Sequence, residues 1–280
     1  MKKILKFGGS SVADGSCIQR VTRIIQQNIG ADHEVFIVVS ALSGITDQLL
    51  GLAKSLQDNQ GVDLKLKQIL DHHQHVIQEL ALDTPSELQN KIEVISAQLK
   101  QTLTQFTKDP ARFLQWQDEL LSYGERFSAN ILTANLENTG IVAECLDARQ
   151  VIITDANFGD AYVHYQRSYD RIRAYLKGHS KLQVITGFMG ATEAGTTTTL
   201  GRSGSDYSAS IFGAALNVGE IEIWTDVDGI MTANPRLVDE ATTIDRLTYE
   251  EAMELSHAGA RVIFPPTMIP ALYKPIPIVI

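Results

Sequence analysis

The stretch Lys6-Phe7-Gly8-Gly9-Ser10-Ser11-Val12-Ala13-Asp14-Gly15 says most about the fold of this chain. A short apolar run leads into a lysine, two glycines and two hydroxyl residues, and a segment of helical periodicity follows. Glycines let backbone N–H groups approach a phosphate, and the helix start and the lysine add positive potential. We therefore predict a strand, an anion-binding turn and a helix. The lysine precedes the glycines, so the turn is not of the Walker type, and an ordinary strand-to-helix turn is the alternative.

The composition limits the class of protein and its partners. A chain of 280 residues, 44% hydrophobic and 20% charged, can bury a complete core. The net charge of −9 argues against nucleic acid or an anionic membrane as a partner. Cys17 and Cys145 form no disulfide framework or metal-site spacing, which favours a reducing cytoplasm. No apolar stretch has membrane-spanning length, and Met1-Lys2-Lys3 leads into a strand rather than a signal-peptide core.

Strand and helix signals alternate along most of the chain. Nearly continuous apolar runs, typical of parallel strands covered on both faces, predict strands at 4–7, 35–39, 141–146, 182–186 and 221–225. Amphipathic periodicity predicts a helix capped by Asp14 and further helices at 165–177, 205–217 and 248–257. This alternation predicts an α/β fold, a three-layer α/β/α sandwich with a mostly parallel central sheet.

A helical insertion interrupts the alternation between about residues 46 and 137. An apolar face over 66–80 predicts one helix, and the capping box Thr84-Pro85-Ser86-Glu87 opens another. This region also holds a group of histidines without a carboxylate or cysteine at ligand spacing, so we expect a partly solvated helix face rather than a metal site. These are His72, His73 and His75.

The segment from Gly187 to Asp206 reads GFMGATEAGTTTTLGRSGSD and follows a predicted strand. A glycine- and threonine-rich loop at this position suits an anionic small molecule, and Arg202 can grip a carboxylate or a phosphate with two hydrogen bonds. Two plainer interpretations stay open: the threonines form a linker, and Asp206 is only a charge at a helix N-terminus.

A third segment, Trp224-Thr225-Asp226-Val227-Asp228-Gly229-Ile230 followed by Asn234-Pro235-Arg236, carries two carboxylates and an arginine beyond a strand. Such strand ends line the ligand crevice of open α/β sheets. Asp228-Gly229 is equally typical of a simple turn. The last residues, Ile276-Pro277-Ile278-Val279-Ile280, form a strand pattern that ends without a turn, which suggests a fragment of a longer protein; a closing strand tucked into the sheet is the alternative.

Together these segments resemble the aspartate kinases of the amino acid kinase family. The likeness covers essentially the whole chain, and the combination of motifs is far more specific than any one of them. The segments that carry it are 6–11 (KFGGSS), 39–47 (VSALSGITD), 123–125 (YGE), 187–188 (GF), 197–206 (TTTLGRSGSD) and 225–230 (TDVDGI).

The resemblance implies transfer of a phosphoryl group from ATP to the side-chain carboxylate of L-aspartate. The product is 4-phospho-L-aspartate, the first intermediate of lysine, threonine and methionine biosynthesis. That carboxylate is already ionised at neutral pH, so the nucleophile needs no general base. The enzyme must supply in-line positioning and charge neutralisation. We expect Mg²⁺ as the counter-ion of ATP, a cytoplasmic location and a homo-oligomeric full-length protein.

The resemblance also assigns roles to single residues. Lys6 and the turn Gly8, Gly9 and Ser10 would hold the ATP phosphates, and Asp206 would organise Lys6 or a metal-bound water. Arg202 would clamp the substrate carboxylate, and Glu125 would select its ammonium group. The amino-acid pocket would be completed by Ser40, Thr46, Phe188 and Ser205. Nucleotide contacts would come from Thr225, Asp226, Met231, Arg236 and Arg261.

Several of these residues have plainer alternatives or depart from the family pattern. Glu125 has the spacing of an exposed helix residue, and Ser40 and Thr46 could be helix caps. Met231 stands where relatives commonly carry tyrosine, and Gly259-Ala260-Arg261-Val262-Ile263-Phe264-Pro265 has arginine and phenylalanine for the usual lysine and histidine. These departures bear on nucleotide contacts rather than on carboxylate chemistry.

Other functions remain possible on the same fold. One is a non-catalytic or regulatory domain that binds aspartate; another is a kinase acting on glutamate, carbamate or a nucleotide. We expect one catalytic domain over 1–280, with a substrate lobe at 1–200 and a nucleotide lobe at 201–280. The ACT and homoserine dehydrogenase domains of the family have no counterpart in residues 1–280. We therefore expect neither lysine nor threonine to inhibit this part of the protein.

Overall fold

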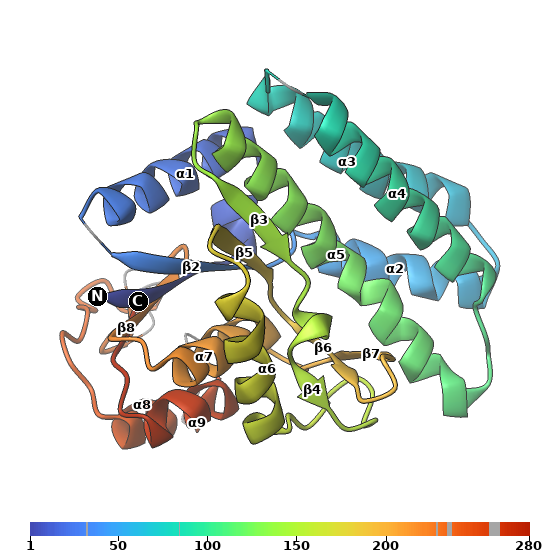
Figure 1. Cartoon of the computed structure of the whole chain (residues 1–280). Coiled ribbons are helices and arrows are strands. Elements are labelled where there is room, and N and C mark those ends of the chain that lie inside the picture. Colours follow the sequence, from blue (N-terminus) through green and yellow to red (C-terminus); the bar gives the residue numbers. More distant parts are fainter. Residues whose placement is uncertain (32, 84, 228, 234–236, 258–263) are drawn as a thin grey trace.

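The computed structural model describes residues 1–31, 33–83, 85–227, 229–233, 237–257 and 264–280 (Figure 1). At its centre lies a six-stranded sheet with the strand order β3-β5-β2-β1-β8-β9, in which all neighbours are parallel. The strands are β1 (Lys2–Phe7), β2 (Glu34–Val39), β3 (Ala143–Leu146), β5 (Leu182–Thr186), β8 (Glu220–Trp224) and β9 (Ile278–Val279). The predicted α/β class and parallel sheet are confirmed.

Helices cover both faces of this sheet, which makes three layers (Figure 1). One face carries α1 (Gly15–Gly30), α2 (Ile45–Asp58), α3 (Val62–Leu80), α4 (Pro85–Thr104) and α5 (Pro110–Asn138); the other carries α6 (Tyr165–Lys177), α7 (Gly204–Leu216), α8 (Tyr249–His257) and α9 (Pro265–Tyr273). Successive side chains of a strand point to opposite faces. Leu5 and Phe7 accordingly pack into the core beneath α1–α5, and Ile4 packs into the core beneath α6, α7 and α9.

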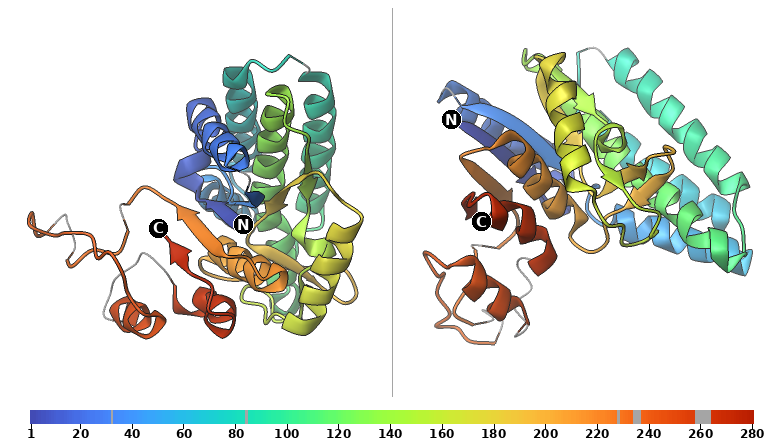
Figure 2. Two further views of the ribbon diagram at one scale, coloured as in Figure 1. Left: turned by 60° about the vertical axis from the view of Figure 1, so that its left-hand side comes forward. Right: turned by 60° about the horizontal axis from the view of Figure 1, so that its bottom comes forward.

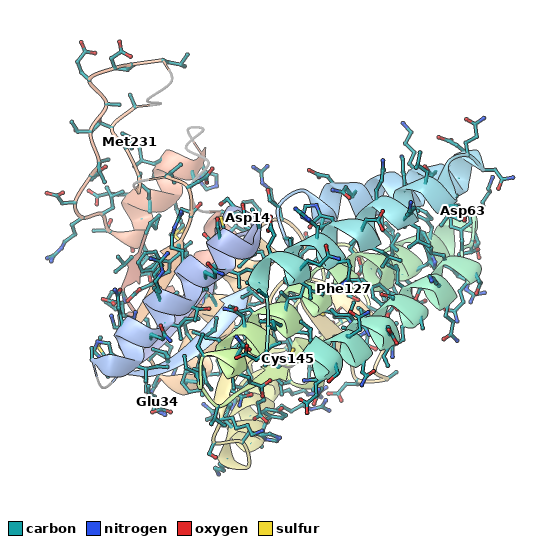
Figure 3. All side chains as sticks on the ribbon, turned by 90° about the horizontal axis from the view of Figure 1, so that it is seen from above. Asp14, Glu34, Asp63, Phe127, Cys145 and Met231 are labelled. Carbon is teal, nitrogen blue, oxygen red and sulfur yellow. The ribbon has the colours of Figure 1, made fainter. Side chains whose placement is uncertain are left out.

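The predicted helical insertion is confirmed as the four helices α2 to α5. Asp14 caps α1 as expected, because its carboxylate accepts a hydrogen bond from the Cys17 N–H at 2.8 Å. In α5 every side chain from Leu120 to Ala129 is buried, since the helix lies between the sheet and α2–α4. Figure 3 shows Phe127 of this helix in the interior; its ring packs 4.3 Å from that of His73 on α3.

The glycine- and threonine-rich loop expected after residue 187 is only partly a loop. Residues Met189–Thr192 and Thr197–Thr199 form the strands β6 and β7 of an antiparallel hairpin, and β6 also pairs with β4 (Ile153–Thr154). The threonines are therefore not a linker. Thr197, Thr198 and Thr199 are 4%, 0% and 1% exposed, and β-branched side chains suit such packed strands.

The C-terminal part of the chain extends the sheet. β9 joins the edge of the sheet beside β8, with Ile221 opposite Ile278. Between β8 and α8, residues 237–247 extend away from the sheet (Figure 2), and Leu237 is 81% exposed. Two short 3-10 helices, η1 (Gly9–Val12) and η2 (Ala148–Gln150), follow β1 and β3. Within the described ranges, every helix is too short or too polar to cross a bilayer.

Candidate active site

The segments singled out in the sequence meet at the carboxyl edge of the central sheet. In the sheet register, Phe7 at the end of β1 lies beside Val39 of β2 and Trp224 of β8, and Val39 lies beside Thr186 of β5. The loops that leave these strands therefore begin side by side. In open parallel sheets this edge is where ligands bind.

Lys6 and Asp206 form the ion pair at the centre of this edge. The Lys6 Nζ lies 2.6 Å from the Asp206 Oδ1, and the two side chains are only 9% and 13% exposed. Lys6 comes from β1, and Asp206 comes from the first turn of α7. Asp206 is thus more than a charge at a helix N-terminus, because it fixes the position of the lysine ammonium.

The glycine turn after β1 is held tightly against neighbouring backbone. The Gly8 N–H, which the resemblance assigns to a phosphate, donates instead to the Trp224 carbonyl at 3.1 Å and is not available as a phosphate donor. A Cβ atom on Gly9 would lie 3.0 Å from the Ala41 carbonyl oxygen. The Gly9 and Ser10 amides begin η1, and we find no hydrogen-bond partner for them among the described residues. These amides are the available donors of the turn.

Glu125 is buried beside the same edge rather than exposed on a helix surface. Its side chain comes from the middle of α5, and the residue is 3% exposed. Burial raises the pKa of its carboxyl to about 8, although the Ala41 N–H and the charge of Lys6 both favour the ionised form. The Oε2 atom has no hydrogen-bond partner within the part of the chain that the structure describes. A buried acceptor of this kind is suited to a donor supplied by a ligand.

The loop after β2 is clamped against α5 by small residues. A Cβ atom on Gly124 would lie 2.7 Å from the Ala41 Cβ, so only glycine lets the helix approach this closely. The Ser128 hydroxyl donates to the Ser40 carbonyl at 2.7 Å. Ser40 and Thr46 do not cap α2, whose N-cap is Gly44; both are half-buried. The clamp fixes the distance between Glu125 and the loop.

Phe188 is held against the start of α7. Phe188 has a φ of +71°, in the left-handed region, and its N–H donates to the Ser208 hydroxyl at 3.0 Å. A Cβ atom on Gly187 would lie 2.6 Å from the Ser205 Oγ, and one on Gly204 would lie 2.7 Å from the Phe188 ring. The strained backbone is held by these contacts, which position Ser205 and the Phe188 ring together.

Arg202 lies in the turn that leads into α7. It lies just before α7, four residues ahead of Asp206, and its side chain is exposed. Among the described residues we find no hydrogen bond or ion pair to its guanidinium. The preceding Gly201 has a φ of +71°, and a Cβ there would lie 2.4 Å from the Asp160 Oδ1. The arginine is therefore free to bind an anion.

The structure brings together fewer of the residues that were expected to contact the nucleotide. Thr225 and Asp226 follow β8 and are exposed, with a hydrogen bond of 3.2 Å between their side chains. Met231 is half-buried on the segment after β8 and bridges to Thr243; Figure 3 shows it at the opposite end of the molecule from Asp63. The other two residues of this group, Arg236 and Arg261, lie outside the described residues, and so does Asp228, the second carboxylate of the segment 224–230.

Asp118 is a residue of the site's framework that sequence reasoning missed. Its buried carboxylate accepts hydrogen bonds from the Thr199 N–H and hydroxyl at 2.9 and 2.7 Å and from the Gly159 N–H at 2.9 Å. Burial nevertheless raises its pKa. It anchors the end of β7, three residues before Arg202. Its position seven residues ahead of Glu125, two turns along α5, is the one signal that could have found it.

Comparison with known proteins defines the family. Residues 1–280 match the model of the amino acid kinase family, and the chain belongs to this family. It is similar to aspartokinases: 33% of residues are identical to the aspartokinase of Chlamydia muridarum over 98% of this chain and 59% of that protein. It is also 33% identical to the chloroplastic bifunctional aspartokinase/homoserine dehydrogenase 2 of Arabidopsis thaliana, over 100% of this chain and 31% of that protein.

A solved structure agrees with these relatives. Aspartokinase III of Escherichia coli, in complex with aspartate and ADP in the R-state, superposes with a TM-score of 0.89 at 32% identity, over 99% of this chain and 61% of that one. The expected family and fold are thereby confirmed. The chain spans about 60% of the length of the single-function aspartokinases it matches.

Proposed function

We propose that the chain is the catalytic domain of an aspartate kinase. It transfers the γ-phosphoryl group of ATP to the side-chain carboxylate of L-aspartate and yields 4-phospho-L-aspartate and ADP. The observation that carries this proposal is Glu125, a buried carboxylate with an unpartnered oxygen beside the Lys6–Asp206 pair. The similarity to an aspartokinase crystallised with aspartate and ADP supports it.

The substrate is recognised by opposite charges on two sides of the pocket. Glu125 accepts the ammonium group of aspartate, and Arg202 binds its α-carboxylate with a bidentate pair of hydrogen bonds. Ser40, Thr46, Phe188 and Ser205 shape the space between them. The side-chain carboxylate is thereby directed toward Lys6, at the end of β1.

The transfer itself needs positioning and charge neutralisation rather than a base. An oxygen of the substrate carboxylate forms the new bond to the γ-phosphorus while the bond to the β,γ-bridging oxygen of ATP breaks, and that electron pair leaves with ADP. Lys6 offsets the charge of the phosphoryl group between two anions, and Asp206 holds the lysine in place at 2.6 Å. Such preorganised charge is the main source of rate enhancement in phosphoryl transfer.

The nucleotide lies over the glycine turn and the segment after β8. The Gly9 and Ser10 amides bind its phosphates, and Thr225, Asp226, Met231, Arg236 and Arg261 contact the rest of it. We propose that Mg²⁺ accompanies ATP and is bound chiefly by its phosphates and by water. When bound, this ion would neutralise charge on the ATP phosphates, and Asp206, 2.6 Å from Lys6, would hold a metal-bound water.

The wider setting follows from the same activity. We propose residues 1–200 as the substrate lobe and 201–280 as the nucleotide lobe. The reaction opens lysine, threonine and methionine biosynthesis, the protein acts in the cytoplasm, and the full-length protein is a homo-oligomer.

Trapping of the product tests the activity. An acyl phosphate reacts with hydroxylamine to give a hydroxamate, which forms a coloured complex with ferric iron. With ATP, Mg²⁺, aspartate and hydroxylamine we expect aspartyl hydroxamate in step with ADP release, none with glutamate, and about 100-fold less or lower still with the Lys6→Met variant. Absence of hydroxamate at saturating ATP and aspartate would contradict the proposal.

A further inference from the structure

A polar cavity lies away from the sheet edge, between α4, α5 and the β6–β7 hairpin. It has a volume of about 480 Å³, within the range of small-molecule sites. The α5 residues Glu119, Tyr123 and Arg126 form one wall, and Arg149 of η2 and Thr197 of β7 form another. We call this cavity the arginine pocket. Figure 1 shows the β6–β7 hairpin beside α5.

The arginine pocket is separate from the candidate active site. Each residue of an α-helix advances about 100° around its axis, so Glu119, Tyr123 and Arg126 share one face of α5, and Glu125 lies on another. The Glu125 carboxylate is bound by the Ala41 N–H, on the side of the sheet edge. None of the residues that line the pocket is among those proposed for aspartate or ATP.

Positive charge in the pocket exceeds the negative charge that faces it. Asp147 neutralises Arg149 through close contacts, with its Oδ2 2.6 Å from the Arg149 Nη2. Arg126 has Glu119 as its acidic partner, and Glu119 is shared with Arg149. Arg112 is exposed at the rim, and in the described residues we find no acidic partner for it. The three guanidinium groups thus face two carboxylates.

The Glu119 carboxylate, which Arg126 and Arg149 share, makes only long contacts with both guanidinium groups. The Glu119 oxygens lie 3.4 Å from the Arg126 Nη1 and 3.4 Å from the Arg149 Nη1. Strong charge-assisted hydrogen bonds are shorter, about 2.7–2.9 Å. Arg126 is 9% exposed and stacks 4.3 Å above the Tyr123 ring, so its guanidinium is fixed in orientation. Arg126 thus has one close partner, the Gln98 side chain, and only a long contact to its acidic partner Glu119, so it retains capacity for a further negative acceptor.

Amide groups surround the arginines and add neutral donors. The pocket is lined by four glutamines, and one of them accepts a hydrogen bond from the Arg126 Nη2. They are Gln98, Gln101, Gln105 and Gln115. Gln98 and Gln101 on α4, and Gln105 directly after its last residue, recur at helical spacing and so face the pocket together. A lining of guanidinium and amide donors matches an oxygen-rich anion better than an apolar ligand.

We propose that the arginine pocket binds a small oxyanion of the phosphate or dicarboxylate type, held between Arg112 and Arg126. The ligand accepts hydrogen bonds from guanidinium N–H groups that Glu119 does not satisfy, and it neutralises the surplus positive charge of the pocket. Both ligand types share the same chemistry, namely two or more negative oxygens that match the fork of a guanidinium.

Calorimetric titration of the full chain tests this proposal, with inorganic phosphate in one series and malonate in the other. We expect saturable binding of at least one probe, and the tighter one identifies the type of oxyanion. Arg112→Gln and Arg126→Gln should each weaken that binding about tenfold or more, as expected for a lost charge-assisted contact. Arg167→Gln, which breaks an exposed ion pair with Glu193, is the matched control and should bind like the unmodified chain.

Two results would overturn the proposal. One is that neither probe binds at millimolar concentration. The other is that binding is undiminished in Arg112→Gln, which would place the anion elsewhere, for example at the candidate active site. Arg112 is exposed, so this variant keeps the fold even if Arg126→Gln, at a buried position, does not.

Discussion

The charge of Glu125 should govern the affinity for aspartate. Its pKa of about 8 means that most of the free enzyme carries a neutral carboxyl at pH 7, whereas binding of the substrate ammonium requires the carboxylate. Between pH 6 and pH 8 the ionised fraction rises about fifty-fold. We therefore expect the KM for aspartate to fall by about that factor over this range, while kcat changes little.

The Glu125→Gln variant separates this charge from the shape of the side chain. It keeps an acceptor for the Ala41 N–H but removes the partner of the ammonium, a loss of about 3 kcal/mol or roughly a hundred-fold in KM at pH 8. Steady-state kinetics at several pH values should show a high KM with no slope between pH 6 and pH 8. Glu137→Gln, at an exposed position of the same helix, should behave like the unmodified chain. A slope that persists in Glu125→Gln would refute the reasoning.

The same substitution should stabilise the free protein. The carboxyl pKa is about 8 in the folded chain against 4.5 in the unfolded chain, so the unfolded state binds fewer protons between these values. The free energy of unfolding therefore decreases as the pH rises from about 4.5 to 8. Urea unfolding at pH 8 should show Glu125→Gln to be the more stable protein. An equal or lower stability would mean that the carboxylate is satisfied in the fold and not reserved for a ligand.

Three further predictions concern the lysine, the helix contact and a buried histidine. Lys6→Met should lower kcat about 100-fold or more, because it removes the cation beside the transferred group; coupled ADP-release kinetics would detect this, and kcat within a factor of three would contradict it. Gly124→Ala should raise the KM for aspartate and lower the Tm, since its Cβ would lie 2.7 Å from that of Ala41; Gly51→Ala, with its Cβ 3.5 Å from a lysine Nζ, should leave the KM unchanged. Burial lowers the pKa of His73 to about 4 from 6.5, so about 3 kcal/mol of stability should be lost as the pH falls from 6.5 to 4; urea unfolding of His73→Leu should show a weaker pH dependence, and an unchanged one would count against it.

Local patterns were enough to predict most of the fold. The strand at 182–186 and the helix at 165–177 have the expected bounds, because apolar runs and amphipathic periodicity report burial directly. The β6–β7 hairpin was missed, since glycine and threonine are common in loops as well as in strands. Only the contacts of Thr199 with Asp118 and of Thr198 with Thr154 of β4 show that these threonines are buried.

The site was harder to predict because its chemistry depends on contacts between distant segments. The Gly8 N–H is used by the carbonyl of Trp224, more than 200 residues away along the chain, and no local motif reveals this. Likewise, the spacing of Glu125 could not show that the middle of α5, from Leu120 to Ala129, is buried on all sides, or that the Glu125 carboxylate lies near the charge of Lys6. The identities of the residues were predictable; their protonation and available donors were not.

A crystal structure with a non-hydrolysable ATP analogue and aspartate tests the central claim most directly. The account predicts the substrate ammonium on Glu125, the α-carboxylate on Arg202 and the γ-phosphate on Lys6, with a side-chain carboxylate oxygen about 3–3.5 Å from the γ-phosphorus and in line with the leaving oxygen. Aspartate bound away from Glu125, or with its side-chain carboxylate directed away from the γ-phosphate, would contradict it.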